Sequence, residues 1–273
     1  MDEGLRKRLS QIKHVALDMD GTIYLSDTLF PYTLPFLGKL DEMGISYTFL
    51  TNNPSRCRKD YIDKLCRMGI PAGMDRMYTT IEATIGYIRA NLPGVKKMYM
   101  LGTPSMVSEF EAAGFVQEEK SPEAVVVSFD MTLTYERLCK ASWWIGKGLP
   151  YIATNPDRVC PTDLPTILVD CGSICACIES ATGRKPDVTL GKPDPQMIYA
   201  IARDFGVEAS EMAIVGDRLY TDIASGINAG ALSVLVLSGE TSLPDVNRSG
   251  IRPDLICRDL EEFGNLLEDN RIE

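Results

Sequence analysis

The stretch that decides the fold is HVALDMDGTIYL, residues 14–25. Its first four residues form an apolar run that is typical of a buried strand. Two aspartates, Asp18 and Asp20, follow with one residue between them. Because side chains alternate along an extended chain, both carboxylates would point to the same side if the extension continued. Two like charges next to each other at the end of an apolar strand repel, so this arrangement indicates a chemical role for the pair.

The composition limits the classes of protein to which the chain can belong. Its 273 residues, 45% of them hydrophobic, suffice for one large domain or two ordinary ones. A net charge of −10 argues against binding to duplex nucleic acid, although a local positive site for a small anion stays open. No apolar stretch is long enough to cross a bilayer, and the charged N-terminal segment lacks an apolar signal region. We therefore expect a cytoplasmic protein that does not bind membranes.

The cysteines and the single histidine do not predict a metal centre. Eight cysteines are too few for a disulfide framework in a chain of this length. Only Cys171, Cys175 and Cys177 form a cluster, and they lack the paired C-x-x-C spacing of a zinc site. We expect them to be small buried thiols on a helix. His14 precedes the aspartates within the first strand, which favours a structural role.

Strand-like and helix-like segments alternate along the whole chain. Apolar runs predict strands at residues 14–18, 46–51, 97–101, 123–130, 150–154, 212–217 and 232–237. Amphipathic patterns predict helices at residues 56–69, 134–148, 193–206 and 219–230, and Gly69, Gly206 and Gly230 mark helix ends. This alternation predicts the α/β class, with a mostly parallel sheet covered on both faces. Candidate domain seams lie at residues 181–195 and near 77–83.

Polar residues follow several of the predicted strands or open the next helix. In an open α/β sheet, ligands gather at the carboxyl ends of the strands. Besides Asp18 and Asp20, the residues that occupy such positions are Thr51, Asn52, Asn53, Lys192, Asp217 and Asp222. We expect these groups to converge on one edge of the sheet, and this convergence is the main signal of a site.

Carboxylates that share one cleft repel each other unless a cation joins them. Mg²⁺ takes oxygen ligands and commonly links protein carboxylates to a substrate phosphate. An aspartate can also accept a phosphoryl group, while Lys192 and Thr51 would hold the phosphoryl oxygens. A second carboxylic acid two residues away would protonate the leaving oxygen and later activate water. This chemistry gives a reason for the spacing of Asp18 and Asp20.

Four short segments together resemble a known family. In order, DMDGT (18–22), FLTNN (49–53), GKPDP (191–195) and VGDRLYTDI (215–223) are similar to the four motifs of the haloacid dehalogenase (HAD) superfamily. The flanking segments LTNNPSR (50–56), ATNPD (153–157) and residues 181–195 resemble the NagD-like and p-nitrophenylphosphatase-like branch. The likeness covers nearly the whole chain.

The resemblance implies a Rossmann-like core and Mg²⁺-dependent hydrolysis of a small phosphate monoester through an aspartyl-phosphate. It implies that Asp18 is the nucleophile and that Asp20 is the general acid and base. The implied metal ligands are Asp18, the backbone carbonyl of Asp20, and Asp217, with Asp222 supporting the ion directly or through water. The implied phosphate-binding residues are Thr51 and Lys192, with Asn52 and Asn53 lining the site.

The branch also carries a large α/β cap between the second and third motifs. The stretch from Thr51 to Lys192 is too long for a loop. We therefore expect a cap at residues 81–185 and a core formed by residues 1–80 and 186–273. The adjacent Trp143 and Trp144 make a homodimer through the cap an open alternative to a monomer. Two segments of the cap are candidates to face the substrate, although a turn explains them as well: Asn155, Asp157 and Arg158, and Gly172 and Ser173.

Three other functions share parts of this pattern. A haloalkanoate dehalogenase would use the same nucleophile but needs neither a metal nor an acid at the second aspartate. A phosphotransferase or mutase would keep all four motifs and pass the phosphoryl group to a hydroxyl. A non-catalytic, metal-binding regulatory module would not require both Asp18 and Asp20.

Overall fold

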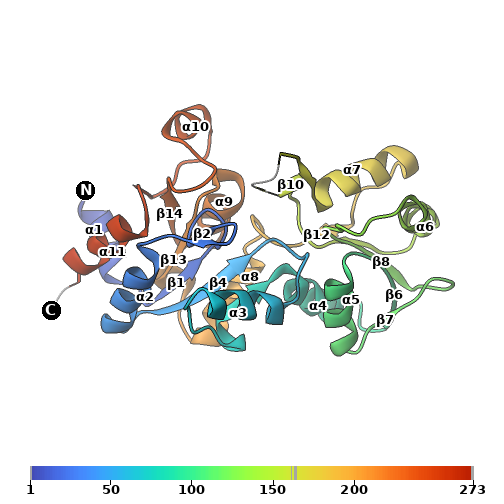
Figure 1. The fold of residues 1–273 in the computed structure, drawn as a ribbon, viewed down its shortest axis with the longest axis horizontal. Helices are drawn as coiled ribbons and strands as arrows, with labels where there is room; N and C mark the ends of the chain where they lie inside the picture. Colours follow the sequence, from blue (N-terminus) through green and yellow to red (C-terminus); the bar gives the residue numbers. More distant parts are fainter. Residues whose placement is uncertain (1, 161, 163–164, 272–273) are drawn as a thin grey trace. The chain divides into compact units, whose positions relative to one another are not determined.

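The computed structural model describes residues 2–160, 162 and 165–271. The chain divides into two compact units, each of which contains its own sheet (Figure 1). The first unit consists of Met1–Leu50, Ile62–Tyr78 and Lys192–Glu273. The second consists of Thr51–Tyr61 and Thr79–Gly191. The polypeptide therefore leaves the first unit and returns to it.

The first unit contains a six-stranded sheet in the order β15-β14-β13-β1-β4-β5. These strands are β1 (His14–Leu17), β4 (Ser46–Thr51), β5 (Met77–Thr79), β13 (Met212–Gly216), β14 (Leu232–Val236) and β15 (Leu255–Cys257). Strand β1 is central and pairs in parallel with β13 and β4, with Leu17 opposite Val215 and Phe49. Every residue of β1, β13 and β14 is buried, which explains why these strands are mostly apolar rather than alternating. The polar residues within them, His14 and Ser233, are fully buried.

Helix α11 of this unit packs against both α1 and α2, and α8 packs against α9. In α2 and α11, Phe36 and Phe263 lie with their ring centroids 5.9 Å apart. Gly206 and Gly230 adopt left-handed conformations that end α8 and α9. The helices associated with this unit are α1 (Glu3–Ser10), α2 (Thr33–Glu42), α3 (Arg58–Arg67), η1 (Met74–Arg76), α8 (Gln196–Phe205), η2 (Ala209–Glu211), η3 (Leu219–Ile223), α9 (Ala224–Ala229), α10 (Leu243–Arg248) and α11 (Leu260–Asp269); β2 (Tyr24–Leu25) and β3 (Thr28–Leu29) form a hairpin after β1.

The second unit contains a parallel five-stranded sheet in the order β12-β9-β8-β6-β7. Side chains alternate across it: Met98 and Met100 of β6 pack in one cluster with helices α4 and α5, whereas Tyr99 and Leu101 pack in another with α6 and α7. Both faces of the sheet are thus covered by helices. The elements are α4 (Thr80–Asn91), β6 (Lys97–Leu101), α5 (Pro104–Ala112), β7 (Val116–Gln117), β8 (Ala124–Val127), α6 (Tyr135–Gly146), β9 (Tyr151–Ala153), β10 (Val159–Cys160), β11 (Leu168–Val169), α7 (Cys171–Thr182) and β12 (Val188–Thr189).

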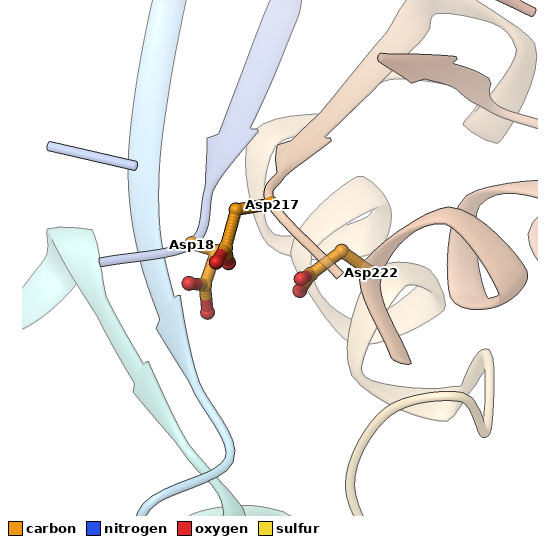
Figure 2. Close-up of side chains that lie close together, drawn as sticks. All are labelled: Asp18, Asp217 and Asp222. Carbon is orange, nitrogen blue, oxygen red and sulfur yellow. The ribbon is translucent and has the colours of Figure 1, made fainter. Parts of the chain in front are cut away.

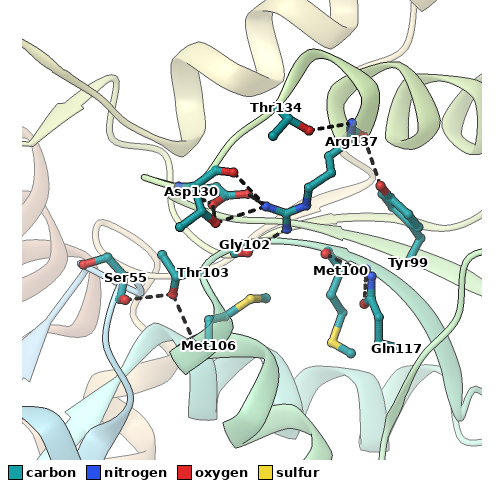
Figure 3. A network of polar contacts seen from close by, with 11 residues as sticks. Ser55, Tyr99, Met100, Gly102, Thr103, Met106, Gln117, Asp130, Thr134 and Arg137 are labelled. Carbon is teal, nitrogen blue, oxygen red and sulfur yellow. Dashed lines mark hydrogen bonds and ion pairs between the residues drawn. The ribbon is translucent and has the colours of Figure 1, made fainter.

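A polar network fastens α6 to the segments that follow β6 and β8 (Figure 3). The guanidinium of Arg137 lies 2.6 Å from the buried carboxylate of Asp130 and donates to the Gly102 carbonyl at 2.8 Å. Thr103 caps the start of α5 by accepting from the Met106 N–H. This network satisfies buried polar groups that the turns after the two strands would otherwise leave without partners.

The predicted fold class is confirmed, and each of the seven predicted strands has a counterpart in the structure. The eight cysteines are all free, and Cys171 and Cys175 are buried on α7 as expected. Cys177 is exposed on the same helix, so the prediction that it is a buried thiol was wrong. Among the described residues, no helix is long and apolar enough to cross a membrane.

Candidate active site

Three carboxylates meet at the carboxyl ends of β1 and β13 in the first unit. Asp18 directly follows β1, Asp217 directly follows β13, and Asp222 lies in the helical turn η3. Each offers one oxygen such that these atoms all lie within 4.8 Å of one another, and Figure 2 shows the three side chains gathered together. The short separation follows from the parallel pairing of β1 with β13, which places Asp18 and Asp217 at the same edge of the sheet.

Lys192 supplies the positive charge of this cluster. Its side chain is 2% exposed, and Nζ donates to Asp18 Oδ1 and to Asp222 Oδ1 at 2.5 Å each. A buried ammonium requires such compensation, because an unpaired charge away from water is costly. The structure thus brings together four of the predicted site residues: Asp18, Lys192, Asp217 and Asp222.

The two carboxylate oxygens of Asp217 differ in their hydrogen bonding. Its Oδ2 accepts from the Glu240 backbone N–H at 2.6 Å. Its Oδ1 is buried and has no hydrogen-bond partner among the described residues. Gly21 and Gly239 lie so close that a Cβ at either position would overlap the Asp217 carboxylate. The φ of Gly21 is +85°, a conformation that also favours glycine there.

Asp222, in contrast, has partners on both oxygens. Oδ1 accepts from Lys192, and Oδ2 accepts from the Arg218 backbone N–H at 3.1 Å. Gly216 permits this approach, because a Cβ there would overlap the Asp222 side chain. The arrangement favours Asp222 as the group that orients Lys192.

Burial and mutual repulsion shift the acid–base behaviour of these groups. Burial raises the pKa of Asp18 well above its usual value, and the charges of Asp222 and Asp217 add to this effect against the opposing charge of Lys192. Burial, followed by the charge of Asp222, raises the pKa of Asp217 to about 7. Burial acts to lower the pKa of Lys192, but the two carboxylates that it contacts outweigh this and raise it. The cluster therefore holds more negative charge than one ammonium balances.

These residues fit a divalent cation. The clustered carboxylates are hard oxygen donors. Within the described part of the chain, the buried Oδ1 of Asp217 lacks the hydrogen-bond partner that a buried carboxylate oxygen requires. A bound cation would also remove the repulsion that raises the pKa values of Asp18 and Asp217.

Asp20 lies in the turn that follows Asp18. Its backbone forms a bridge with Tyr24, and the Gly21 N–H donates to the Tyr24 carbonyl at 2.8 Å. Strand β1 ends at Leu17, and the Asp18 N–H still donates to the Val215 carbonyl at 2.8 Å. The N–H groups of Thr22 and Ile23 then donate to the Met19 carbonyl, so Asp20 lies in a turn and not in a continued extension. The chemical roles predicted for Asp20 stay predictions.

Thr51, Asn52 and Asn53 group with the second unit, although Thr51 is the last residue of β4. Thr51 Oγ1 accepts from the Asn53 N–H at 3.1 Å, and Asn53 Oδ1 accepts from the Ser55 N–H at 2.9 Å. Asn52 donates to Asp157 at 2.8 Å. Their predicted contacts with phosphate stay predictions.

The predicted substrate-facing residues of the cap are occupied by local contacts within the second unit. Asn155 is fully buried and donates to Asp157 at 3.1 Å and to Asp170 at 3.0 Å. Ser173 donates to the Arg158 carbonyl at 2.7 Å. A Cβ on Gly172 would overlap the Pro156 carbonyl, so this glycine permits close packing of α7 on the loop. These contacts describe a tightly ordered loop, in line with the turn alternative.

The segment after β14, residues 237–241, contributes to the site although no site residue was predicted in it. It supplies the Glu240 amide to Asp217, and Ser238 Oγ donates to the Gly21 carbonyl at 2.7 Å. Its position after an apolar strand was the only signal available in the sequence.

Comparisons with known proteins agree with this geometry. A family model described as "Haloacid dehalogenase-like hydrolase" matches residues 15–116, and one described as "HAD-hyrolase-like" matches residues 189–263. The ribonucleotide monophosphatase NagD of Escherichia coli is 33% identical over 252 residues, which cover 92% of this chain and 98% of that protein. The acid sugar phosphatase of Staphylococcus aureus is 32% identical over 93% of this chain and 97% of that protein.

A solved structure extends the likeness to the fold. The crystal structure of a 4-nitrophenylphosphatase from Thermotoga maritima is similar with a TM-score of 0.91 and 45% identity, over 94% of this chain and 98% of that chain. The match spans both units, including the segment between the second and third motifs. The chain therefore belongs to the haloacid dehalogenase-like hydrolases, in the branch of NagD and the p-nitrophenylphosphatases, and is an enzyme of the phosphatase class.

Proposed function

We propose that this phosphatase hydrolyses a small organic phosphate monoester and requires Mg²⁺. The carrying observation is the hydrogen bond from Lys192 to Asp18, next to Oδ1 of Asp217, for which the described residues supply no hydrogen-bond partner. The relatives named ribonucleotide monophosphatase and acid sugar phosphatase support a small phosphorylated metabolite as the substrate. Asp18 and Asp217, with the Asp20 carbonyl, would hold the ion, which would offset the negative charge of the phosphoryl group.

In the proposed reaction, an Asp18 carboxylate oxygen attacks phosphorus and the bond from phosphorus to the leaving oxygen breaks. Asp20 gives its proton to that oxygen, so the alcohol departs neutral. Asp20, now ionised, then takes a proton from water. The resulting hydroxyl attacks phosphorus, releases inorganic phosphate and regenerates the Asp18 carboxylate.

Lys192 has two tasks in this proposal. It fixes the rotamer of Asp18 through the 2.5 Å hydrogen bond, and its charge faces the incoming phosphoryl oxygens. Asp222 holds the ammonium from the other side, also at 2.5 Å. The cap predicted at residues 81–185 would exclude water from the intermediate until hydrolysis.

The test measures phosphate release from a panel of sugar phosphates, nucleoside monophosphates, phosphoglycolate, glycerol phosphate and p-nitrophenyl phosphate. Wild type and Asp18→Asn are compared with Mg²⁺ or with EDTA. We expect Mg²⁺-dependent release that Asp18→Asn abolishes, together with a hydroxylamine-sensitive phosphoryl label on the wild type. Release at the wild-type rate from Asp18→Asn would refute the nucleophile. Added acceptor alcohols would reveal a phosphotransferase by forming new esters.

A further inference from the structure

Two backbone amides orient two of the three clustered carboxylates, and they come from different loops. The Arg218 N–H donates to Asp222 Oδ2 at 3.1 Å, and the Glu240 N–H donates to Asp217 Oδ2 at 2.6 Å. Arg218 lies just after β13, and Glu240 lies in the segment after β14. Because β13 and β14 are neighbouring parallel strands, both loops emerge at the same edge of the sheet.

The side chains of the same two residues join these loops. Arg218 Nε lies 2.9 Å from Glu240 Oε2, with the arginine side chain 14% exposed and the glutamate 45% exposed. We propose that the Arg218–Glu240 ion pair is a clamp that positions Asp217 and Asp222 for metal binding. Arg218 and Glu240 are thus positioning residues, which act through backbone amides without touching the substrate.

The segment that carries Glu240 is fitted closely enough to transmit this restraint. The Thr241 N–H donates to the Asp217 carbonyl at 3.2 Å, and Ser238 is bonded to the Gly21 carbonyl. Gly239 packs directly on the Asp217 carboxylate, leaving no room for a Cβ. A shift of this segment would therefore move Asp217 and remove the hydrogen bond that fixes its Oδ2.

The clamp and simple electrostatics predict opposite effects for the loss of Arg218. Arg218 is a cation close to the carboxylates, so on charge alone its removal would strengthen the binding of another cation. Loss of the clamp would weaken binding, because Asp217 and Asp222 would no longer be held in place. The sign of the change in Mg²⁺ affinity therefore separates the two explanations.

The experiment is calorimetric titration of Mg²⁺ into metal-free, full-length protein without substrate. We expect Arg218→Gln and Glu240→Gln each to weaken Mg²⁺ binding about tenfold. The double variant should bind no more weakly than the weaker single variant, because both changes remove the same interaction. Arg258→Gln is the matched control: its Nε also contacts a glutamate Oε2, at 3.0 Å on Glu262, and its loss should leave Mg²⁺ affinity unchanged.

A second readout separates positioning from a general loss of folded protein. The Mg²⁺ concentration for half-maximal phosphatase activity should rise with the binding constant, while kcat at saturating Mg²⁺ stays within about threefold of the wild type. If Arg218→Gln does not fold, Glu240→Asp replaces it, since it keeps the charge and shortens the reach. The clamp predicts weaker binding for Glu240→Asp, and charge alone predicts no change.

Unchanged or tighter Mg²⁺ binding by Arg218→Gln would overturn the clamp, as would wild-type binding by Glu240→Asp. The inference rests on the proposed metal requirement, and the titration distinguishes failure of the clamp from failure of the metal requirement. Wild-type protein that binds no Mg²⁺ would refute the metal requirement itself. Wild-type protein that binds Mg²⁺ as tightly as its clamp variants do would refute the clamp alone.

Discussion

Nζ of Lys192 lies 2.5 Å from Oδ1 of Asp18, although 174 residues separate them in the sequence. The same ammonium contacts Asp222, so one cation is shared by two carboxylates in a site where Lys192 is 2% exposed. Removal of the ammonium leaves buried negative charge without compensation, whereas removal of either carboxylate leaves the other paired. This asymmetry makes Lys192 the residue on which the cluster most depends in the absence of metal.

Lys192→Met should destabilise the metal-free protein by about 3 kcal/mol at pH 8. The pKa of Asp18 is already raised above that of the unfolded chain, and loss of Lys192 raises it further. A carboxyl group whose pKa is raised in the folded protein lowers the free energy of unfolding as pH rises. The difference in free energy of unfolding between wild type and Lys192→Met should therefore shrink as pH falls toward 4. Urea unfolding at several pH values measures this. Lys39→Met, which removes an ion pair with the exposed Glu268, is the control and should cost about 1 kcal/mol or less. A deficit independent of pH would contradict the prediction.

Asp20→Asn should slow both halves of the proposed reaction. An amide neither protonates the leaving oxygen nor accepts a proton from water, so we expect kcat to fall by about two to four orders of magnitude. The defect should be smaller for p-nitrophenyl phosphate than for a sugar phosphate, because p-nitrophenolate departs without protonation. Steady-state kinetics with both substrates measure this difference. The acid role is read from kcat/KM, because hydrolysis of the intermediate is common to both esters and contributes only to kcat. Equal defects in kcat/KM on the two esters would remove Asp20 from the role of acid.

Asp217→Asn should weaken Mg²⁺ binding more than Asp222→Asn does. Asp217 has a buried oxygen that accepts no hydrogen bond from residues 2–160, 162 and 165–271, whereas both oxygens of Asp222 already accept one. The pKa of Asp217 is raised to about 7, so Mg²⁺ must displace a proton below that pH. Calorimetry in buffers of different ionisation enthalpy should show proton release that grows as pH falls from 8 to 6. Equal Mg²⁺ affinity in the two variants would contradict the assignment.

His14→Gln should reduce the loss of free energy of unfolding that acidification causes. Burial, assisted by the charge of Arg76, lowers the pKa of His14 to about 4 from 6.5. The unfolded chain therefore binds a proton that the folded protein refuses, and stability is lost as pH falls from 6.5 toward 4. Between pH 7 and 5 this amounts to about 2 kcal/mol, from the expected shift of roughly 1.4 kcal/mol per pKa unit.

The comparison is clean because His14 is the only histidine in the chain. Glutamine keeps hydrogen-bonding atoms for Ser46 and Thr48, which lie 2.7 and 3.0 Å from the ring nitrogens. Urea midpoints at pH 7 and pH 5 give the measurement. If wild type and variant lose the same stability on acidification, His14 is not the source.

Self-association through the cap stays a prediction, and α6 offers a surface for it. Trp143 is 60% exposed and Tyr135 is 83% exposed on the same face of the helix, with exposed Cys139 between them. Trp144 instead packs against the hydrophobic core of the second unit. We expect Trp143→Glu to weaken association, measured by sedimentation velocity, without changing the fold. A wild-type protein that is monomeric at 100 μM would contradict the prediction.

The sequence by itself determined the strands and the residues that end them. Strands β4 and β6 coincide with their predicted ranges. Apolar runs such as those of β8 and β13 reflect burial on both faces of a parallel sheet. Asp18 and Asp217 were identifiable for the same reason: each is the first polar residue after such a run. Local periodicity and strand ends depend on residues that are adjacent in the chain, so they can be predicted from the sequence.

Only the tertiary structure decided how these residues pair. Three sets of contacts join separate loops: those of Lys192 with Asp18 and Asp222, that of the Glu240 amide with Asp217, and that of Arg218 with Glu240. Asn155 and Asp157 are likewise buried partners within their own unit, a pairing that neither the substrate-facing expectation nor the turn alternative specified. Such pairings depend on loop conformation, strand register and the loss of solvent around each charge. Those quantities are set by the packing of distant segments, so no local pattern in the sequence encodes them.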